Sequence, residues 1–278
     1  MSGNELNSPV ESLDSPPRTT WPQAEVSSSL DPRPRSLALM GLVMIVAGAA
    51  AGLASWRVGE WAQAYFAPTF EMSKELSSNA VSSAQEIGRQ KRLAVQQVAS
   101  AAYGSMGAVL GLLLGACGSP WRGGLRRVIA AMAGAVLGGT LCWLCTRLML
   151  GIYWRAFMES ATHLSHDVLF PILIHGGMWA GAGLGAGLAF GLGGEGWKSP
   201  AIAALGGIVG AILGTLVFDV LGGIAFPLAS TTNPIPATAN ARLLVHMSVC
   251  LMSAVGILWA TRPSPAKSPG GVATSAAV

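Results

Sequence analysis

Apolar residues in this chain gather in long runs separated by short polar stretches. The first run, 36–56, lies between Arg35 and Arg57. At about 1.5 Å per residue it is long enough to cross a hydrocarbon core of about 30 Å. Further charge-free windows predict five more spans, at about 101–120, 127–149, 168–192, 200–222 and 240–262. We therefore expect an all-α fold, a polytopic transmembrane helix bundle of about six spans.

The polar stretches divide the chain into further segments. Residues 1–35 and 263–278 are rich in Ser and Pro, and they contain too few apolar residues to form a packed core, so we predict disordered tails. Residues 57–100 form a polar connector whose apolar positions fall at close to helical spacing, which predicts an amphipathic helix running into the second span. The remaining core, 101–226, contains four of the predicted spans.

The composition changes this picture little but excludes several classes of protein. Charged residues are 11% of the chain and hydrophobic residues 51%, whereas an average soluble domain has about 25% charged residues. The mean hydropathy is +0.51. The net charge of +4 is small and dispersed, so we expect the lipid bilayer and not nucleic acid as the partner. All four cysteines lie inside apolar segments and do not indicate a secreted disulfide framework.

Glycines recur within the core at a spacing of about one helical turn. Two sets are related by a constant offset of 76 residues, and a Trp-plus-basic pair follows each at the same place, Trp121-Arg122 and Trp197-Lys198. The glycines concerned are Gly107, Gly111, Gly115, Gly134 and Gly138 in the first set, and Gly183, Gly187, Gly191, Gly210 and Gly214 in the second. Small residues at this spacing let helix backbones approach closely in lipid.

The glycine pattern predicts an internal repeat of two helical hairpins, at about 101–149 and 168–226, each packed as a glycine zipper. A chance self-alignment of a Gly/Ala/Leu-rich chain is the alternative. The same glycine faces could also pack against a second copy of the chain, so a homo-oligomer is a further hypothesis.

The positions of basic residues give an orientation. Eight of the 17 fall on one side of the six-span arrangement: Arg33, Arg35, Arg122, Arg126, Arg127, Lys198, Arg262 and Lys267. The positive-inside rule makes that side cytoplasmic and places both termini there. Arg89, Lys91 and Arg92, at the start of the second span, argue for the opposite orientation. The Gly/Ala-heavy composition suggests a bacterial inner membrane.

Three ionisable residues interrupt the apolar spans: His175, Asp219 and His246. Such residues are costly in a membrane and often functional. All three fall toward the same, outer, end of the predicted bundle, where they could form a proton relay or substrate site. Alternatively, each lies separately near the lipid headgroups without a joint role. A metal site using His163, His166 and Asp167, which follow helical i, i+3 spacing, is the third possibility.

Cys142-x-x-Cys145 could be a redox or metal pair, but inside an apolar helix the two cysteines are better interpreted as small packing residues.

The segment 104–112 resembles the nucleophile segment of rhomboid intramembrane proteases, and His175 with its following glycines resembles their catalytic-histidine helix. This resemblance implies Ser105 as nucleophile and His175 as base. The sequence departs from the family pattern because Met106 separates Ser105 from the next glycine.

No motif is specific enough to name a reaction. The sequence therefore predicts a non-enzymatic membrane scaffold or interaction protein, with no catalytic residues, metal or cofactor assigned. A small transporter or channel component with a polar site near His175, Asp219 and His246 is the main alternative. A rhomboid-like hydrolase is the remote one.

Overall fold

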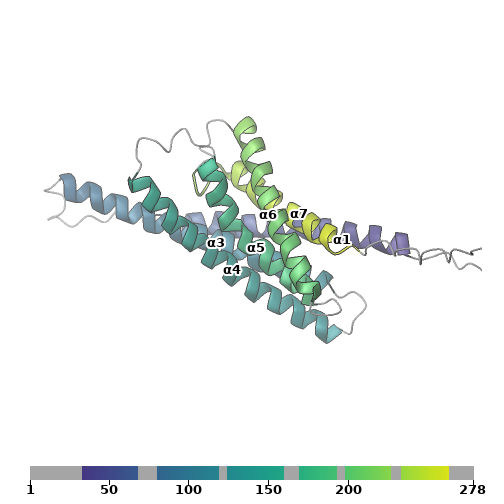
Figure 1. Cartoon of the computed structure of the whole chain (residues 1–278). Helices are drawn as coiled ribbons and strands as arrows, with labels where there is room; N and C mark the ends of the chain where they lie inside the picture. Colours follow the sequence, from purple (N-terminus) through teal and green to yellow (C-terminus); the bar gives the residue numbers. More distant parts are fainter. Residues whose placement is uncertain are drawn as a thin grey trace, which may run out of the picture.

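The computed structural model describes residues 33–67, 80–118, 124–159, 169–192, 198–226 and 233–262. Apart from 233–238 and a few residues at helix ends, these ranges are helical, as Figure 1 shows, and all six helices in them are long and apolar enough to cross a membrane by length and composition. The helices are α1 (Arg33–Tyr65), α3 (Ala80–Cys117), α4 (Gly124–Glu159), α5 (Leu169–Leu192), α6 (Lys198–Ala225) and α7 (Ala239–Ala260). The predicted six-span helical membrane protein is therefore supported.

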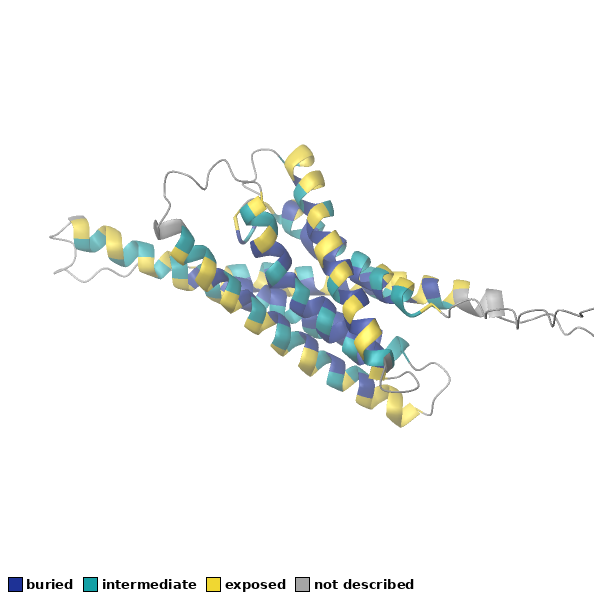
Figure 2. Ribbon diagram, viewed as in Figure 1, coloured by how far each residue is buried: buried dark blue, intermediate teal, exposed yellow. Residues whose placement is uncertain are grey.

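The six helices form a closed ring in which each packs against its neighbours. Following the ring, α1 contacts α3, α3 contacts α4, α4 contacts α5, α5 contacts α6, α6 contacts α7, and α7 returns to α1. Contacts between α3 and α5 cross the middle of the ring. The most apolar window of α5 is 67% buried and that of α3 is 61% buried, whereas that of α4 is only 22% buried. The centre of the bundle is therefore α3 and α5, with apolar outer faces left for lipid (Figure 2).

Several helices run past the ends expected from hydropathy. The first continues nine residues beyond position 56, to Tyr65, and α4 ends at Glu159 and not near 149. Hydropathy windows end where charged residues begin, but backbone hydrogen bonding can continue the helix into the polar interface. The most extended example is α3, whose 38 residues measure about 57 Å at about 1.5 Å per residue.

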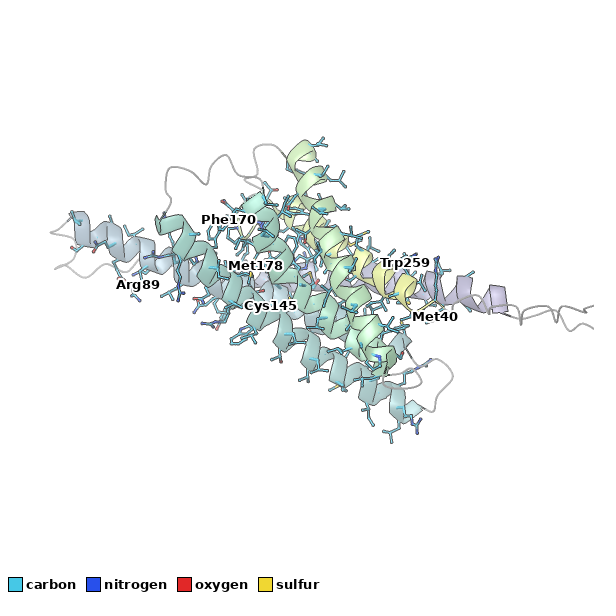
Figure 3. All side chains as sticks on the ribbon, viewed as in Figure 1. Met40, Arg89, Cys145, Phe170, Met178 and Trp259 are labelled. Carbon is cyan, nitrogen blue, oxygen red and sulfur yellow. The ribbon has the colours of Figure 1, made fainter. Side chains whose placement is uncertain are left out.

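The long α3 explains the polar connector. Its first half carries the charged residues of the predicted amphipathic helix and runs without a break into the apolar half. Arg89 lies on the part of α3 that projects beyond the bundle, far from Trp259 near the end of α7 (Figure 3). The predicted tails at 1–35 and 263–278 lie outside the described residues apart from the first turn of α1, which begins at Arg33.

Helix backbones touch directly at many of the glycines. A methyl group added to Gly107 would overlap the carbonyl of Gly138, and one added to Gly111 would overlap that of Gly134. The same holds between α5 and α6, where Gly183 meets Gly207 and Gly187 meets Ala203. Gly115 contacts Ala130 in the same α3–α4 interface, and Gly191 contacts Pro200 at the α5–α6 turn.

The second hairpin is not paired in the way that the repeat predicts. An offset of 76 residues would place Gly214 opposite Gly183, but Gly207 lies there. Gly210 and Gly214 instead lie against the α7 backbone, at Met252 and Val249. Gly210 and Gly214 of α6 thus serve the α7 interface, whereas Gly134 and Gly138 of α4 face Gly111 and Gly107 of α3. The internal repeat stays a prediction.

These contacts predict a position-specific effect of adding one methyl group. Gly107→Ala should lower the free energy of unfolding by about 1–3 kcal/mol, because the added methyl forces α3 and α4 apart. Gly151→Ala is the matched control, since nothing lies within 4 Å of the added carbon. There the better helix propensity should leave stability unchanged or raise it by up to about 1 kcal/mol. Thermal unfolding of the two variants in detergent measures both. Equal effects would contradict the packing described.

Candidate functional site

An irregular segment, residues 233–238, leads into α7 beside a group of buried polar side chains. Its carbonyl groups accept hydrogen bonds from side chains of three helices. Tyr103 Oη of α3 donates to Pro234 O at 2.9 Å, and His175 Nε2 of α5 lies 3.1 Å from Asn233 O. Arg242 of α7 donates to the carbonyls of Pro236 and Ala237. Thr238 caps α7 by accepting from the Ala241 amide.

The innermost ionisable pair is His175 with Asp219. His175 Nδ1 lies 3.2 Å from Asp219 Oδ1, and the His175 side chain is 1% exposed against 13% for Asp219. The carbonyl of Asn233 can only accept, so His175 Nε2 carries a hydrogen. A hydrogen bond between Nδ1 and Oδ1 needs one further proton. The pair is then either an imidazolium with a carboxylate or a neutral imidazole with a carboxylic acid, and it is neutral overall in both forms.

Aromatic rings enclose this pair. The Trp179 ring stacks on His175 with a centroid separation of 4.9 Å and an interplanar angle of 10°. Phe218, on the same helix as Asp219, meets His175 edge-on at 5.9 Å. Trp179 and Phe218 are both fully buried. This apolar enclosure strengthens the electrostatic interaction between His175 and Asp219 by lowering the local dielectric.

His246 does not join the His175–Asp219 pair directly. Its Nδ1 lies 2.8 Å from Ser55 Oγ of α1, and Ser55 also donates to Ala51 O at 2.7 Å. Both contacts are hydrogen bonds when His246 Nδ1 carries the hydrogen, because the carbonyl can only accept. A row of rings separates the two histidines: Tyr103 lies 5.7 Å from Trp179 and 5.9 Å from His246. The structure therefore brings together two of the three predicted residues and gives the third another partner.

The most complete ion pair, Glu60 with Arg242, was not identified in the sequence. Arg242 Nε and Nη2 donate to the two carboxylate oxygens of Glu60 at 2.7 and 2.8 Å, while Nη1 reaches the 233–238 segment. Trp56 Nε1 donates to Ala239 O nearby. Ser55 and Tyr103 were missed as well. The available signal was weak: a carboxylate and a guanidinium, each near one end of a predicted span.

A small pocket connects these groups. Its volume is ≈ 10 Å³, about the space needed for one water molecule. Gly59, Glu60, Tyr103, Arg242 and His246 are among the residues that line it. The polar end of the bundle is therefore closely packed.

The Ser105–His175 pair implied by the rhomboid resemblance is not formed. Ser105 Oγ donates to Ala102 O at 2.8 Å, and both ring nitrogens of His175 contact other groups. Cys142 is a buried free cysteine whose Sγ lies 3.5 Å from Met178 O, and Cys145 is also free.

No group of metal-ligating residues is found in the described ranges. Within those ranges, no three His, Cys, Asp or Glu side chains lie close enough together to hold a metal ion. His163, His166 and Asp167, the predicted alternative metal ligands, lie outside these ranges.

Comparisons with known proteins give no family. No family model matches the chain, and no similar protein was found among curated proteins or among solved structures.

The Glu60–Arg242 pair predicts measurable coupling. In a double-mutant cycle of Glu60→Gln and Arg242→Gln, the coupling energy should be about 0.5–3 kcal/mol, because the pair is largely buried and bidentate. Thermal or denaturant unfolding in detergent measures it. Glu86 and Arg89 form a matched bidentate pair on the exposed part of α3, where solvent screening should leave no measurable coupling. Similar coupling for both pairs would show that burial at the polar end adds nothing.

Proposed function

We propose that this chain is a small proton-linked transporter or channel component in which His175 and Asp219 form the proton-binding pair. The observation that supports this most directly is their contact, 3.2 Å between His175 Nδ1 and Asp219 Oδ1 at the interface of α5 and α6. Ionisable residues that face the interior of a membrane bundle and pair with each other are typical of proton and ion pathways.

The energetics favour a functional role for the pair. A single charged side chain at the centre of a membrane helix costs about 2.5–3.5 kcal/mol on insertion scales. Apolar residues of similar volume in a purely structural bundle would avoid this cost, since replacing a buried ion pair with packed apolar groups is often neutral or stabilising. His175 lies six residues from the start of α5 and Asp219 six residues from the end of α6, so this figure is an upper bound for them, and a functional role would account for their presence.

The contacts of the pair couple its proton to the backbone. His175 holds Asn233 O through Nε2 and Asp219 through Nδ1. Loss of the shared proton removes the Nδ1–Oδ1 hydrogen bond and leaves a net negative charge in an apolar enclosure. Both changes destabilise the contact between α5 and α6, so we expect these helices to move apart. Asp219 Oδ2 is buried without a hydrogen-bond partner in the described part of the chain, which leaves it able to accept a proton or bind a cation.

A non-enzymatic membrane scaffold or interaction protein is the second candidate. It is favoured by the direct backbone contacts of Gly107 with Gly138 and of Gly183 with Gly207, which leave no space for passage between those helices. This proposal includes packing through glycine faces, the internal repeat, a homo-oligomer and a bacterial inner membrane with both termini in the cytoplasm.

Proton flux in reconstituted vesicles tests the transport proposal. The full chain is placed in liposomes that contain a pH-sensitive dye, and a pH step is applied with the membrane potential clamped, alone and with cationic, anionic and neutral solutes. Wild-type protein should admit protons faster than empty liposomes in at least one condition. Asp219→Asn and His175→Gln should reduce the rate to that of empty liposomes, because neither variant retains the shared proton.

Glu86→Gln is the control for the loss of a carboxylate. Glu86 lies on the projecting part of α3, paired with Arg89, and its substitution should leave the flux unchanged. Flux equal to empty liposomes for the wild type in every condition would contradict the transport proposal and leave the scaffold as the better account. Flux that survives Asp219→Asn would reject the assigned pair.

A further inference from the structure

A groove opens on the outside of the bundle next to the Glu60–Arg242 pair, and the proposed function does not use it. It lies between the end of α1, the first half of α3 and the 233–238 segment, with a volume of ≈ 380 Å³. This is within the range of sites that hold small organic ligands. The groove shares Gln63, Val98, Ile235 and Arg242 with the small inner pocket, so the two lie next to each other.

The walls of the groove are apolar and its charges are positive on balance. Phe66, Val95, Val98 and Ile235 are among its apolar lining residues. The charged side chains that face the groove and the inner pocket are Lys91, Arg242 and Glu60, and His246 lies at the inner end. Glu60 and Arg242 neutralise each other.

Lys91 is therefore the unbalanced charge of the groove. Its side chain is exposed, and it has no ion-pair partner among the described residues. Among the described residues, the groove thus combines apolar walls with the Lys91 ammonium group at its rim, which is complementary to a molecule with an apolar body and an anionic head.

The position of the groove selects the kind of amphiphile. On α1, Trp61 and Tyr65 are 59% and 67% exposed and stack on each other at 5.1 Å, in the same last part of the helix as Gln63. Exposed Trp and Tyr on a membrane helix are typical of the headgroup region. The molecules present there at high concentration are the lipids of that leaflet.

We infer that this groove binds an anionic phospholipid. Its phosphate lies at Lys91, and an acyl chain follows the wall formed by Val95, Val98 and Ile235. The lipid then covers the outer side of the ion pair that supports the 233–238 segment.

Native mass spectrometry of the full chain in detergent tests this assignment. Phosphatidylglycerol and phosphatidylcholine with identical acyl chains are titrated separately, and wild-type protein should retain phosphatidylglycerol more strongly. Lys91→Gln should weaken phosphatidylglycerol binding about fivefold, because one cation near the headgroup is lost. Val95→Trp, which fills the groove, should weaken it further without changing the unfolding temperature.

Arg92→Gln is the matched control because it removes a neighbouring cation that does not line the groove, and it should leave binding unchanged. Equal losses for Lys91→Gln and Arg92→Gln would overturn the inference in favour of diffuse surface attraction. Equal retention of the two lipids by the wild type would also overturn it. Competition by millimolar glycerol phosphate would replace the lipid with a soluble phosphate compound and reject the assignment.

Discussion

Non-helical backbone near a membrane must have its carbonyl groups satisfied by the protein, and the polar end of this bundle follows from that constraint. The 233–238 segment contains Pro234 and Pro236, neither of which has an amide hydrogen to donate. Side chains supply the donors instead: Tyr103, His175 and Arg242 reach carbonyls of the segment from three different helices. The segment thus fixes those helices relative to one another, and it brings two histidines, a carboxylate and an ion pair to one end of the molecule.

Close helix packing gives that end a rigid base. Contacts of Gly107 with Gly138 and of Gly183 with Gly207 bring backbones together where a methyl group would not fit. In lipid, association of helices depends on such packing, since lipid tails are as apolar as the side chains. The bundle is therefore tight at its glycines and polar under the 233–238 segment. In the proposed function, a change of charge at His175 and Asp219 would affect the contacts under the 233–238 segment and not the glycine interfaces.

The sequence was sufficient to predict the helices but not to predict which groups the polar residues contact. Long runs with few charges predicted all six spans, whereas the amphipathic helix expected within 57–100 stays a prediction, because residues 68–79 lie outside the described ranges. Helix packing was harder, because Gly206, Gly210 and Gly214 lie on a face that could meet either α5 or α7, and periodicity does not distinguish two neighbours. His175 and Asp219 could be selected as costly residues in lipid. Ser55 and Tyr103 could not, since hydroxyl groups in apolar helices are common and their partners, 191 and 131 residues away in sequence, are set by the fold.

The protonation of His175 in a bilayer is the central point of this account. Nitrogen-15 solid-state NMR of histidine-labelled protein reads the two ring nitrogens directly, with His175→Gln used to assign the signal. We expect Nε2 to carry a hydrogen and Nδ1 to share one with Asp219, so that Asp219→Asn shifts the Nδ1 signal strongly and leaves His246 unchanged. A His175 Nδ1 signal that is unprotonated in the wild type and indifferent to Asp219→Asn would contradict the proton-sharing pair and the function built on it.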